Sequence, residues 1–326
     1  MKRKIFYILP LLLMVTALAG ICFGSTPISP VQLWQALTGR GEETLKLILW
    51  NIRLPRVLGG ILAGMGLAVA GVLLQTVTDN ALASPNLIGV NSGAGLAVIG
   101  LLTLFPAAGA LLPVGAFLGA FAATGLILLA AGRLGTTKTG LLLMGIAITT
   151  LLNAAISFLS LLDEGVFSQY HHFTLGSLKA LRLESLVLPG LLILLSAACA
   201  MILSGRLQTL CLGDSAAAAL GVRVKGLRIA ALACAAACSA SVVSFAGLLG
   251  FVGLIVPHMA RALVGQSPRW RIPAAALLGG ILVVLADLLG RTLFAPSELP
   301  VGIVMSFIGA PYFLILLLRR KRHASV

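Results

Sequence analysis

The stretch from Asn80 to Gly132 contains no charged residue, and this run most limits what the chain can fold into. A membrane-spanning helix needs about 20 apolar residues, so the run is long enough for two. Prolines divide it into segments near 88–105 and 113–132. Only helices and closed β-barrels satisfy their backbone in lipid, and no alternating strand pattern is present here. The run therefore predicts an all-α membrane protein.

The rest of the chain follows the same pattern. It is 59% hydrophobic and 10% charged, whereas soluble domains carry about 25% charged residues. We therefore expect residues 1–326 to form a single polytopic transmembrane domain of about ten helices. The remaining spans are predicted near 5–24, 56–79, 138–163, 184–206, 272–290 and 299–318, with one full span and a shorter segment within 229–260.

The basic residues predict how these helices are oriented. Ten spans put both termini on one side, and residues 2–4 and 319–322 are all basic, so that side is predicted to be cytoplasmic. Then 16 of the 23 basic residues lie inside and six of the nine acidic residues outside. We interpret the net charge of +14 as an orientation signal, and expect no nucleic-acid partner. Residues 1–24 resemble a signal peptide, but cleavage would leave nine spans, so we expect a retained helix.

The predicted spans offer few polar groups for catalysis or ion coupling. Asp287 is the one carboxylate well inside a span, and it can pair with Arg291 one helical turn later in a structural role. Residues 132–139 superficially resemble a phosphate-binding loop, but they lack the glycine before the lysine and a strand-to-helix setting. We expect no catalytic residue, metal or cofactor. An ion-coupled secondary transporter of a small solute stays the alternative, with Asp287 as a proton relay.

One cytoplasmic connection, residues 212–224, has the composition of a short helix. Asp214 and Ser215 are suited to cap it, residues 216–220 can form its body, and Gly221 can end it. A short helix tethered at both ends is a rigid element. It can be an ordinary connector or a docking element for a cytoplasmic partner.

Several motifs together resemble the FecCD family, the permeases of iron-siderophore, haem and cobalamin ABC importers. The resemblance runs from about residue 50 to the C-terminus, and the order and spacing of the motifs make it specific. The motifs are Arg53-Leu-Pro-Arg56, Asn80-Ala-Leu-Ala-Ser-Pro85, Leu175-Gly-Ser177, the segment 212–222, Gly250-Phe-Val-Gly-Leu-Ile-Val-Pro-His258, Glu298-Leu-Pro-Val-Gly302 and Gly309-Ala-Pro-Tyr-Phe313.

The resemblance implies the type II importer fold in the inner membrane, as a homodimer with the translocation path between its subunits. It implies alternating access, with ferric siderophore as the expected cargo and haem, cobalamin or another chelate left open. ATP hydrolysis is expected in two cytoplasmic ATPase subunits, so the chain itself is expected not to be an enzyme. The ATPases are expected to dock on Gly213, Asp214, Ser215, Ala216, Ala217, Ala218, Ala219, Leu220, Gly221, Val222 and Arg223.

The resemblance also implies a periplasmic or lipid-anchored substrate-binding protein, which delivers cargo at the outer surface. In the family, glutamates of that protein meet outward arginines of the permease. The matching positions here are Arg53, Arg56 and Arg291. Exposed arginines suit this role because a guanidinium can form a bidentate pair with a carboxylate.

Overall fold

The computed structural model describes residues 2–24, 28–38, 42–133, 138–295 and 297–324, and these residues form helices and connecting segments only. Within them, seven helices are long and apolar enough to cross a membrane, and three shorter helices are apolar. The long helices are α1 (Lys2–Cys22), α4 (Leu54–Thr78), α6 (Leu112–Arg133), α7 (Lys138–Ser160), α9 (Leu183–Leu210), α11 (Val224–Ala246) and α13 (Pro268–Thr292). The shorter apolar helices are α5 (Val90–Leu104), α12 (Val252–Val264) and the part Val301–Leu316 of α14 (Val301–Ala324).

These ten helices follow the ten predicted segments in order. The full span and shorter segment expected within 229–260 are α11 and α12, although α12 continues past His258 to Val264. Of the segment likened to a phosphate-binding loop, residues 134–137 lie outside the described residues.

The connections contain further short elements, of which the sequence predicted only α10, within residues 212–224. Local caps explain two of them: Ser29 and Gln32 form a capping box at α2, and Asp163 accepts a 2.7 Å hydrogen bond from the Gly165 N–H at α8. The short elements are α2 (Pro30–Leu37), α3 (Glu43–Ile48), η1 (Leu49–Arg53), η2 (Pro85–Ile88), η3 (Gly109–Leu111), α8 (Glu164–Leu175) and α10 (Asp214–Ala219).

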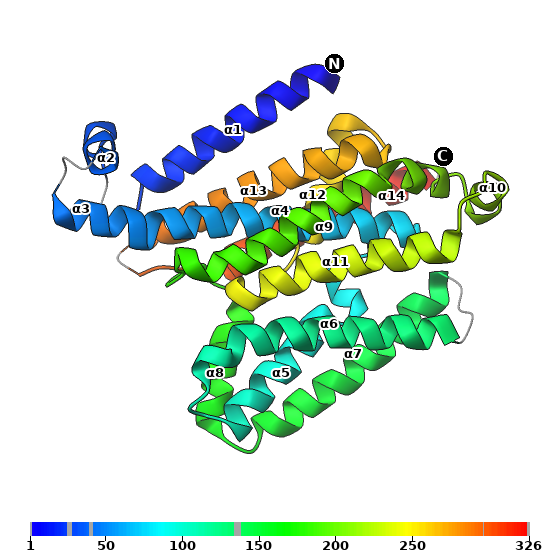
Figure 1. Cartoon of the computed structure of the whole chain (residues 1–326), viewed down its shortest axis with the longest axis horizontal. Helices are drawn as coiled ribbons and strands as arrows, with labels where there is room; N and C mark the ends of the chain where they lie inside the picture. Colours follow the sequence, from blue (N-terminus) through cyan, green and yellow to red (C-terminus); the bar gives the residue numbers. More distant parts are fainter. Residues whose placement is uncertain (1, 25–27, 39–41, 134–137, 296, 325–326) are drawn as a thin grey trace.

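Helix α4 lies at the centre of the bundle, in contact with α1, α9, α11, α12 and α13 (Figure 1). Glycines allow its close approach to α13. A methyl group added to Gly64 would overlap the backbone of Gly279, and one added to Gly279 would overlap the backbone of Gly64. Small residues at such crossings let helix backbones pack directly in lipid. The glycine-rich sequence of α4 thus makes it the helix around which the others pack.

Helices α5, α6, α7 and α8 form a second group beside the central helices, and α6 contacts α11 (Figure 1). The two groups therefore share one packed body. Both ends of the chain lie toward the side of the bundle that carries α10, and α2 and α3 lie at the opposite end (Figure 1).

The polypeptide is broken twice inside the helical bundle. After α4 the chain passes through η2 before α5 begins, and after α11 the segment 247–251 is non-helical before α12 begins. The two breaks meet, because an added methyl group at Gly253 would lie 2.9 Å from Pro85 Cδ and 3.0 Å from the Leu67 carbonyl oxygen. Leu67 lies near the middle of α4, so irregular backbone occurs at mid-depth in the bundle.

Candidate functional site

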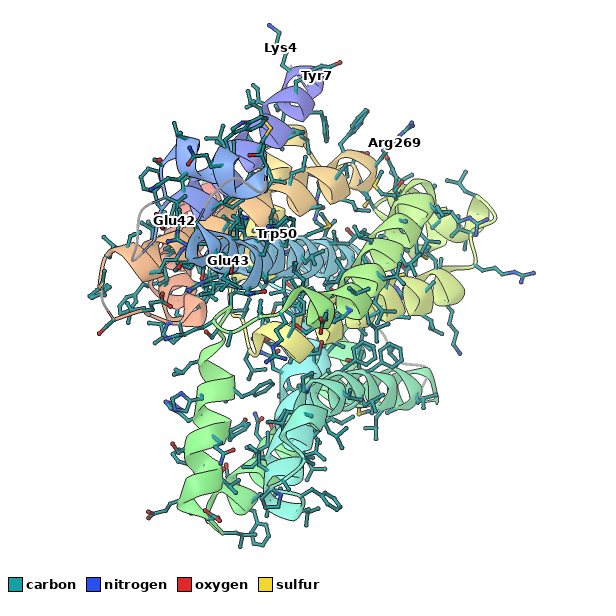
Figure 2. The ribbon with its side chains drawn as sticks, turned by 60° about the vertical axis from the view of Figure 1, so that its left-hand side comes forward. Lys4, Tyr7, Glu42, Glu43, Trp50 and Arg269 are labelled. Atoms are coloured by element: carbon teal, nitrogen blue, oxygen red, sulfur yellow. The ribbon has the colours of Figure 1, made fainter. Side chains whose placement is uncertain are left out.

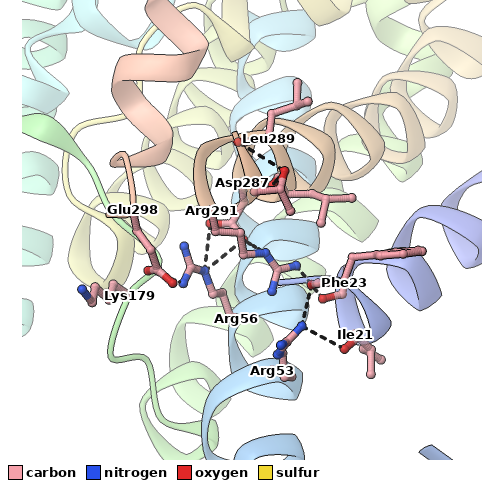
Figure 3. Close-up of polar contacts among 12 residues, drawn as sticks. Ile21, Phe23, Arg53, Arg56, Lys179, Asp287, Leu289, Arg291 and Glu298 are labelled. Atoms are coloured by element: carbon pink, nitrogen blue, oxygen red, sulfur yellow. Dashed lines mark hydrogen bonds and ion pairs between the residues drawn. The ribbon is translucent and has the colours of Figure 1, made fainter. Parts of the chain in front are cut away.

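The three arginines predicted to face outward lie in one buried charged network (Figure 3), at the end of the bundle where α3 and η1 lead into α4. We call the residues Arg53, Arg56, Asp287, Arg291 and Glu298 the outer cluster. Arg53 ends the π-helical turn η1, and Arg56 lies in the first turn of α4. Asp287 and Arg291 lie near the end of α13, and Glu298 lies in the link to α14.

Arg56 joins both carboxylates of this cluster. Its Nε lies 3.0 Å from each Asp287 carboxylate oxygen, and its Nη1 lies 2.9 Å from Glu298 Oε2. Asp287 also faces Arg291, whose Nε lies 3.5 Å from Asp287 Oδ2, an ion pair without a hydrogen bond. The predicted pairing of Asp287 with Arg291 is therefore confirmed, and Arg56 is a partner that the sequence did not predict.

The remaining two arginines fasten helix α1 to the cluster. Arg291 donates a hydrogen bond to the Gly20 carbonyl, and Arg53 donates to the carbonyls of Ile21 and Phe23 (Figure 3). These carbonyls belong to the C-terminal end of α1, where backbone acceptors have no intrahelical donor. Guanidinium groups thus satisfy the end of one helix while they neutralise carboxylates from another.

The expectation that these arginines are exposed is wrong. Their exposed fractions are 3% for Arg53, 6% for Arg56 and 2% for Arg291. The physical reason is that carboxylates and helix-end carbonyls within the chain occupy the guanidinium groups. Glu298 is the more open carboxylate, with a side chain 20% exposed. Partial burial raises the pKa of Glu298, but the hydrogen bond and positive charge of Arg56 outweigh this and leave the pKa below its usual value.

The opposite end of the bundle carries the short helix predicted from residues 212–224. Helix α10 spans Asp214–Ala219 and ends before Gly221, which has a φ of +80°. The predicted capping by Asp214 and Ser215 is wrong, because the N-cap is Gly213 and no side chain caps the helix. Asp214 instead accepts hydrogen bonds of 2.7 and 2.8 Å from Arg228 at the start of α11.

Helix α10 is attached to the bundle by one face. Ala217 is fully buried, and α10 contacts α9 and α11. Ala218, Ala219 and Leu220 are exposed, and Leu220 exposes 62% of its surface. The helix is thus a small apolar projection that is held in place by Ala217 and the Arg228–Asp214 pair.

Three exposed charged residues lie on opposite sides of the bundle. Figure 2 shows Glu42 and Glu43 beside the start of α4, and Arg269 at the start of α13 on the opposite side of the bundle. The acidic pair lies on the predicted outer side and Arg269 on the predicted inner side. The part of the chain that the structure describes has the long apolar helices of a polytopic membrane protein, with a buried charged cluster at one end and a projecting short helix at the other.

Comparisons with known proteins show the family to which the chain belongs. The model of the FecCD transport family matches residues 12–319. The chain is 38% identical to the Fe(3+)-citrate import system permease protein YfmE of Bacillus subtilis, over 95% of this chain and 93% of that protein. It is 37% identical to the hemin transport system permease protein HmuU of Yersinia pestis, over 99% of this chain and 98% of that protein.

A solved structure agrees with these sequence relatives. The fold matches a metal-chelate type ABC transporter in an inward-facing conformation, with a TM-score of 0.89 and 30% identity over 97% of this chain and 99% of that one. The chain therefore belongs to the FecCD transport family and has the type II importer fold. It is the membrane permease subunit of an ATP-binding-cassette importer and is not itself an enzyme.

Proposed function

We propose that this permease pairs with a second copy of itself and moves a ferric chelate across the cytoplasmic membrane by alternating access. Ferric siderophore, ferric citrate and haem are the cargoes to test first. One observation carries the proposal: the chain matches over nearly its whole length permeases that are named for ferric citrate and for hemin. No reaction occurs on the cargo, so the work of the protein lies in its conformational change.

Two ATPase subunits are the proposed energy source, and α10 with its flanking residues 213–223 is their proposed docking surface. A docking element must protrude and must pass force to the spans. Leu220 and its neighbours supply the exposed surface, while the Arg228–Asp214 pair links α10 to the first turn of α11. Movement of α10 by an ATPase would therefore act directly on a helix that packs against α4.

The outer cluster is the proposed docking site of a substrate-binding protein. The arginines of this cluster are the groups that an acidic partner would seek: Arg56 contacts both carboxylates, Arg291 contacts Asp287, and Arg53 lies within the same cluster. The guanidinium groups are buried, and a partner carboxylate would reach Arg56 by taking the place of Glu298, the more open member. Docking would thus release the link between α13 and α14.

The proposed orientation puts α10 and both chain ends in the cytoplasm. This follows the basic termini and the positive-inside rule. The outer cluster then faces the compartment in which a binding protein would carry its cargo.

Reconstituted uptake tests this function. The chain, its ATPase and its binding protein are placed in proteoliposomes, and uptake of radioactive ferric citrate, a ferric trihydroxamate and haemin is measured. We expect uptake of at least one chelate that stops when either partner is left out, and that falls at least tenfold with Arg56→Glu. If the binding protein stimulates ATP hydrolysis but none of these chelates is taken up, the chain is still an ABC importer permease, and a ferric chelate as its cargo is rejected.

A further inference from the structure

We propose that a polar cavity between the broken helices is the place in the path where the transported chelate is held by neutral hydrogen bonds. The contacting side chains are Asn91, Thr174 and Ser306. This inference rests on the proposed function, since it assumes that the cargo is a chelate with oxygen-rich edges. It adds the chemistry by which the permease itself touches that cargo.

The cavity has a volume of about 310 Å³ and is built from four separate parts of the chain. Asn91 comes from the first turn of α5, Thr174 from the last turn of α8, and Ser306 from the second turn of α14. Leu248 and Gly250, in the non-helical link between α11 and α12, complete one wall. The site is therefore formed where several helices begin or end.

The cavity lies at membrane depth. Gly250 lies two residues before the start of α12, whose Gly253 packs against Leu67 near the middle of α4. Within the hydrocarbon region, non-helical backbone is tolerated only where it is buried in protein or lines a water-filled space. In many transporters such interrupted helices mark the substrate site. The interrupted helices and the polar cavity therefore lie together within the membrane-spanning part of the bundle.

The polar groups of the cavity have hydrogen-bonding capacity left over. Among the described residues, none hydrogen-bonds the Asn91 carboxamide, which is partly exposed. The hydroxyls of Thr174 and Ser306 donate to the carbonyls of His171 at 2.7 Å and Gly302 at 2.9 Å, which leaves their oxygens free to accept. An unpartnered amide is costly in a dry apolar site, so a wet cavity explains its position. One amide donor and three oxygen acceptors suit a chelate that presents hydroxyl, carboxylate or hydroxamate groups.

Weak binding is what a transport site requires, because the cargo must leave after it enters. None of the residues lining this cavity, all of them within the described ranges, is charged. Its volume of about 310 Å³ is at the low end of about 300–1,000 Å³ for small-molecule sites. One chain would therefore enclose only part of a ferric chelate, and a second copy would complete the enclosure.

A groove elsewhere on α5 provides a matched contrast. It is lined by α5 and α6 and contains Gly100, Leu101 and Leu118, and all of its lining side chains are apolar. Such a groove suits lipid chains. Asn91 and Gly100 thus lie on the same helix but line spaces of opposite polarity.

The first test asks whether the cavity holds water. In a chain whose five native cysteines are replaced by serine or alanine, Asn91→Cys, Ser306→Cys and Gly100→Cys are treated in membranes with a charged, water-soluble thiol reagent. We expect labelling of the first two at least tenfold faster than of Gly100→Cys. Excess ferric citrate or ferric trihydroxamate, with the binding protein and ATP, should slow Ser306→Cys labelling at least threefold. Equal, slow labelling of all three would overturn the proposal.

The second test removes the hydrogen bonds and keeps the shapes. The variant Asn91→Leu/Thr174→Val/Ser306→Ala is compared with Thr103→Val/Ser160→Ala, whose hydroxyls make the same bonds to carbonyls four residues back but lie outside the cavity. We expect chelate uptake to fall about tenfold or more in the first, since a neutral hydrogen bond contributes about two- to tenfold. ATP hydrolysis stimulated by the binding protein should stay within twofold of wild type in both.

The outcomes separate this inference from the proposed function. Unchanged uptake in the cavity variant would overturn the inference and leave the proposed function intact. Loss of both uptake and stimulated ATP hydrolysis in that variant alone would also overturn it, because the cavity residues would then serve assembly. A wild-type permease that takes up none of the chelates would reject the proposed function and this inference with it.

Discussion

At the end of the bundle that carries α2 and α3, five ionisable side chains form the buried outer cluster, whereas at the opposite end the Arg228–Asp214 ion pair of α10 is partly exposed. Arg56 and Asp287 are both nearly inaccessible, and each contacts more than one partner. The side chains of Asp214 and Arg228, which form an ion pair, are 43% and 21% exposed. The charges of the outer cluster hold helices together, while α10 presents an apolar surface that is exposed among the described residues.

In this membrane protein, buried ion pairs join helices at one end of the bundle, while the other end keeps an exposed surface on which a partner could bind. Breaking a buried ion pair leaves a charge without compensation, which is far more costly than losing a surface pair. Substitutions at the two ends should therefore have different effects. Variants of the outer cluster should mainly lower the stability of the fold, and variants of α10 should mainly weaken partner binding.

The largest expected effect is at Asp287. Asp287→Ala leaves Arg56 and Arg291 without their shared carboxylate, and we expect a loss of about 3–5 kcal/mol in the free energy of unfolding. Thermal unfolding of the purified permease in detergent measures it. Asp163→Ala is the control, because that exposed aspartate caps α8 and should cost about 1 kcal/mol. Equal losses in the two variants would contradict the structural role of Asp287.

Glu298→Gln should cost about 2 kcal/mol, because it removes one charged partner of the buried Arg56. The pKa of Glu298 is lowered in the folded state, so the pair stabilises the fold above the ordinary carboxyl range and is lost as pH falls through the lowered value. The stability difference between wild type and variant should be constant from about pH 7 to 5 and shrink below about pH 4. Glu184→Gln, at an exposed site, is the control and should change the free energy of unfolding by no more than about 0.5 kcal/mol.

At the inner end, Ala218→Glu places a charge on the exposed face of α10. We expect ATPase affinity to fall at least tenfold, or about 1.4 kcal/mol, with no change in thermal stability. Co-purification and titration with the ATPase measure this. Gln266→Glu adds the same charge to another exposed inner residue outside 213–223 and should bind normally. If wild type, Ala218→Glu and Gln266→Glu bind the ATPase with equal affinity, α10 is not part of the docking surface.

The smallest stability effect should come from Asp214→Asn. Its pair with Arg228 is substantially exposed, so the loss should lie below about 1 kcal/mol. If α10 must be held rigid for coupling, chelate uptake should fall more than ATPase binding does. A stability loss as large as that of Asp287→Ala would mean that the two ends do not differ.

The sequence predicted the helices better than the site. Apolar runs bounded by charges located all ten apolar helices, because lipid leaves the backbone few alternatives. Helix α12 was expected to end near His258, after Pro257. Pro257 instead lies inside α12, where the packing of Gly253 against α4 holds the helix in place.

Within the outer cluster, only the local part was predictable. Asp287 and Arg291 are four residues apart, so helical spacing revealed their pairing. Arg56 is 231 positions from Asp287 and 242 from Glu298, and no local pattern shows such contacts. For the same reason, the arginines were expected to be exposed. On the inner side, the short helix was predicted from Gly221 and the alanines, but the Arg228 partner of Asp214 was missed.

The most direct test of the account is the energy source for uptake. Proteoliposomes that contain the permease, its ATPase and its binding protein are supplied with radioactive ferric chelate, and either internal ATP or an imposed proton gradient is provided. The account predicts uptake that requires ATP, persists in the presence of a protonophore and is lost with Ala218→Glu. Uptake by the permease alone, driven by the proton gradient and abolished by Asp287→Asn in a stably folded protein, would contradict it.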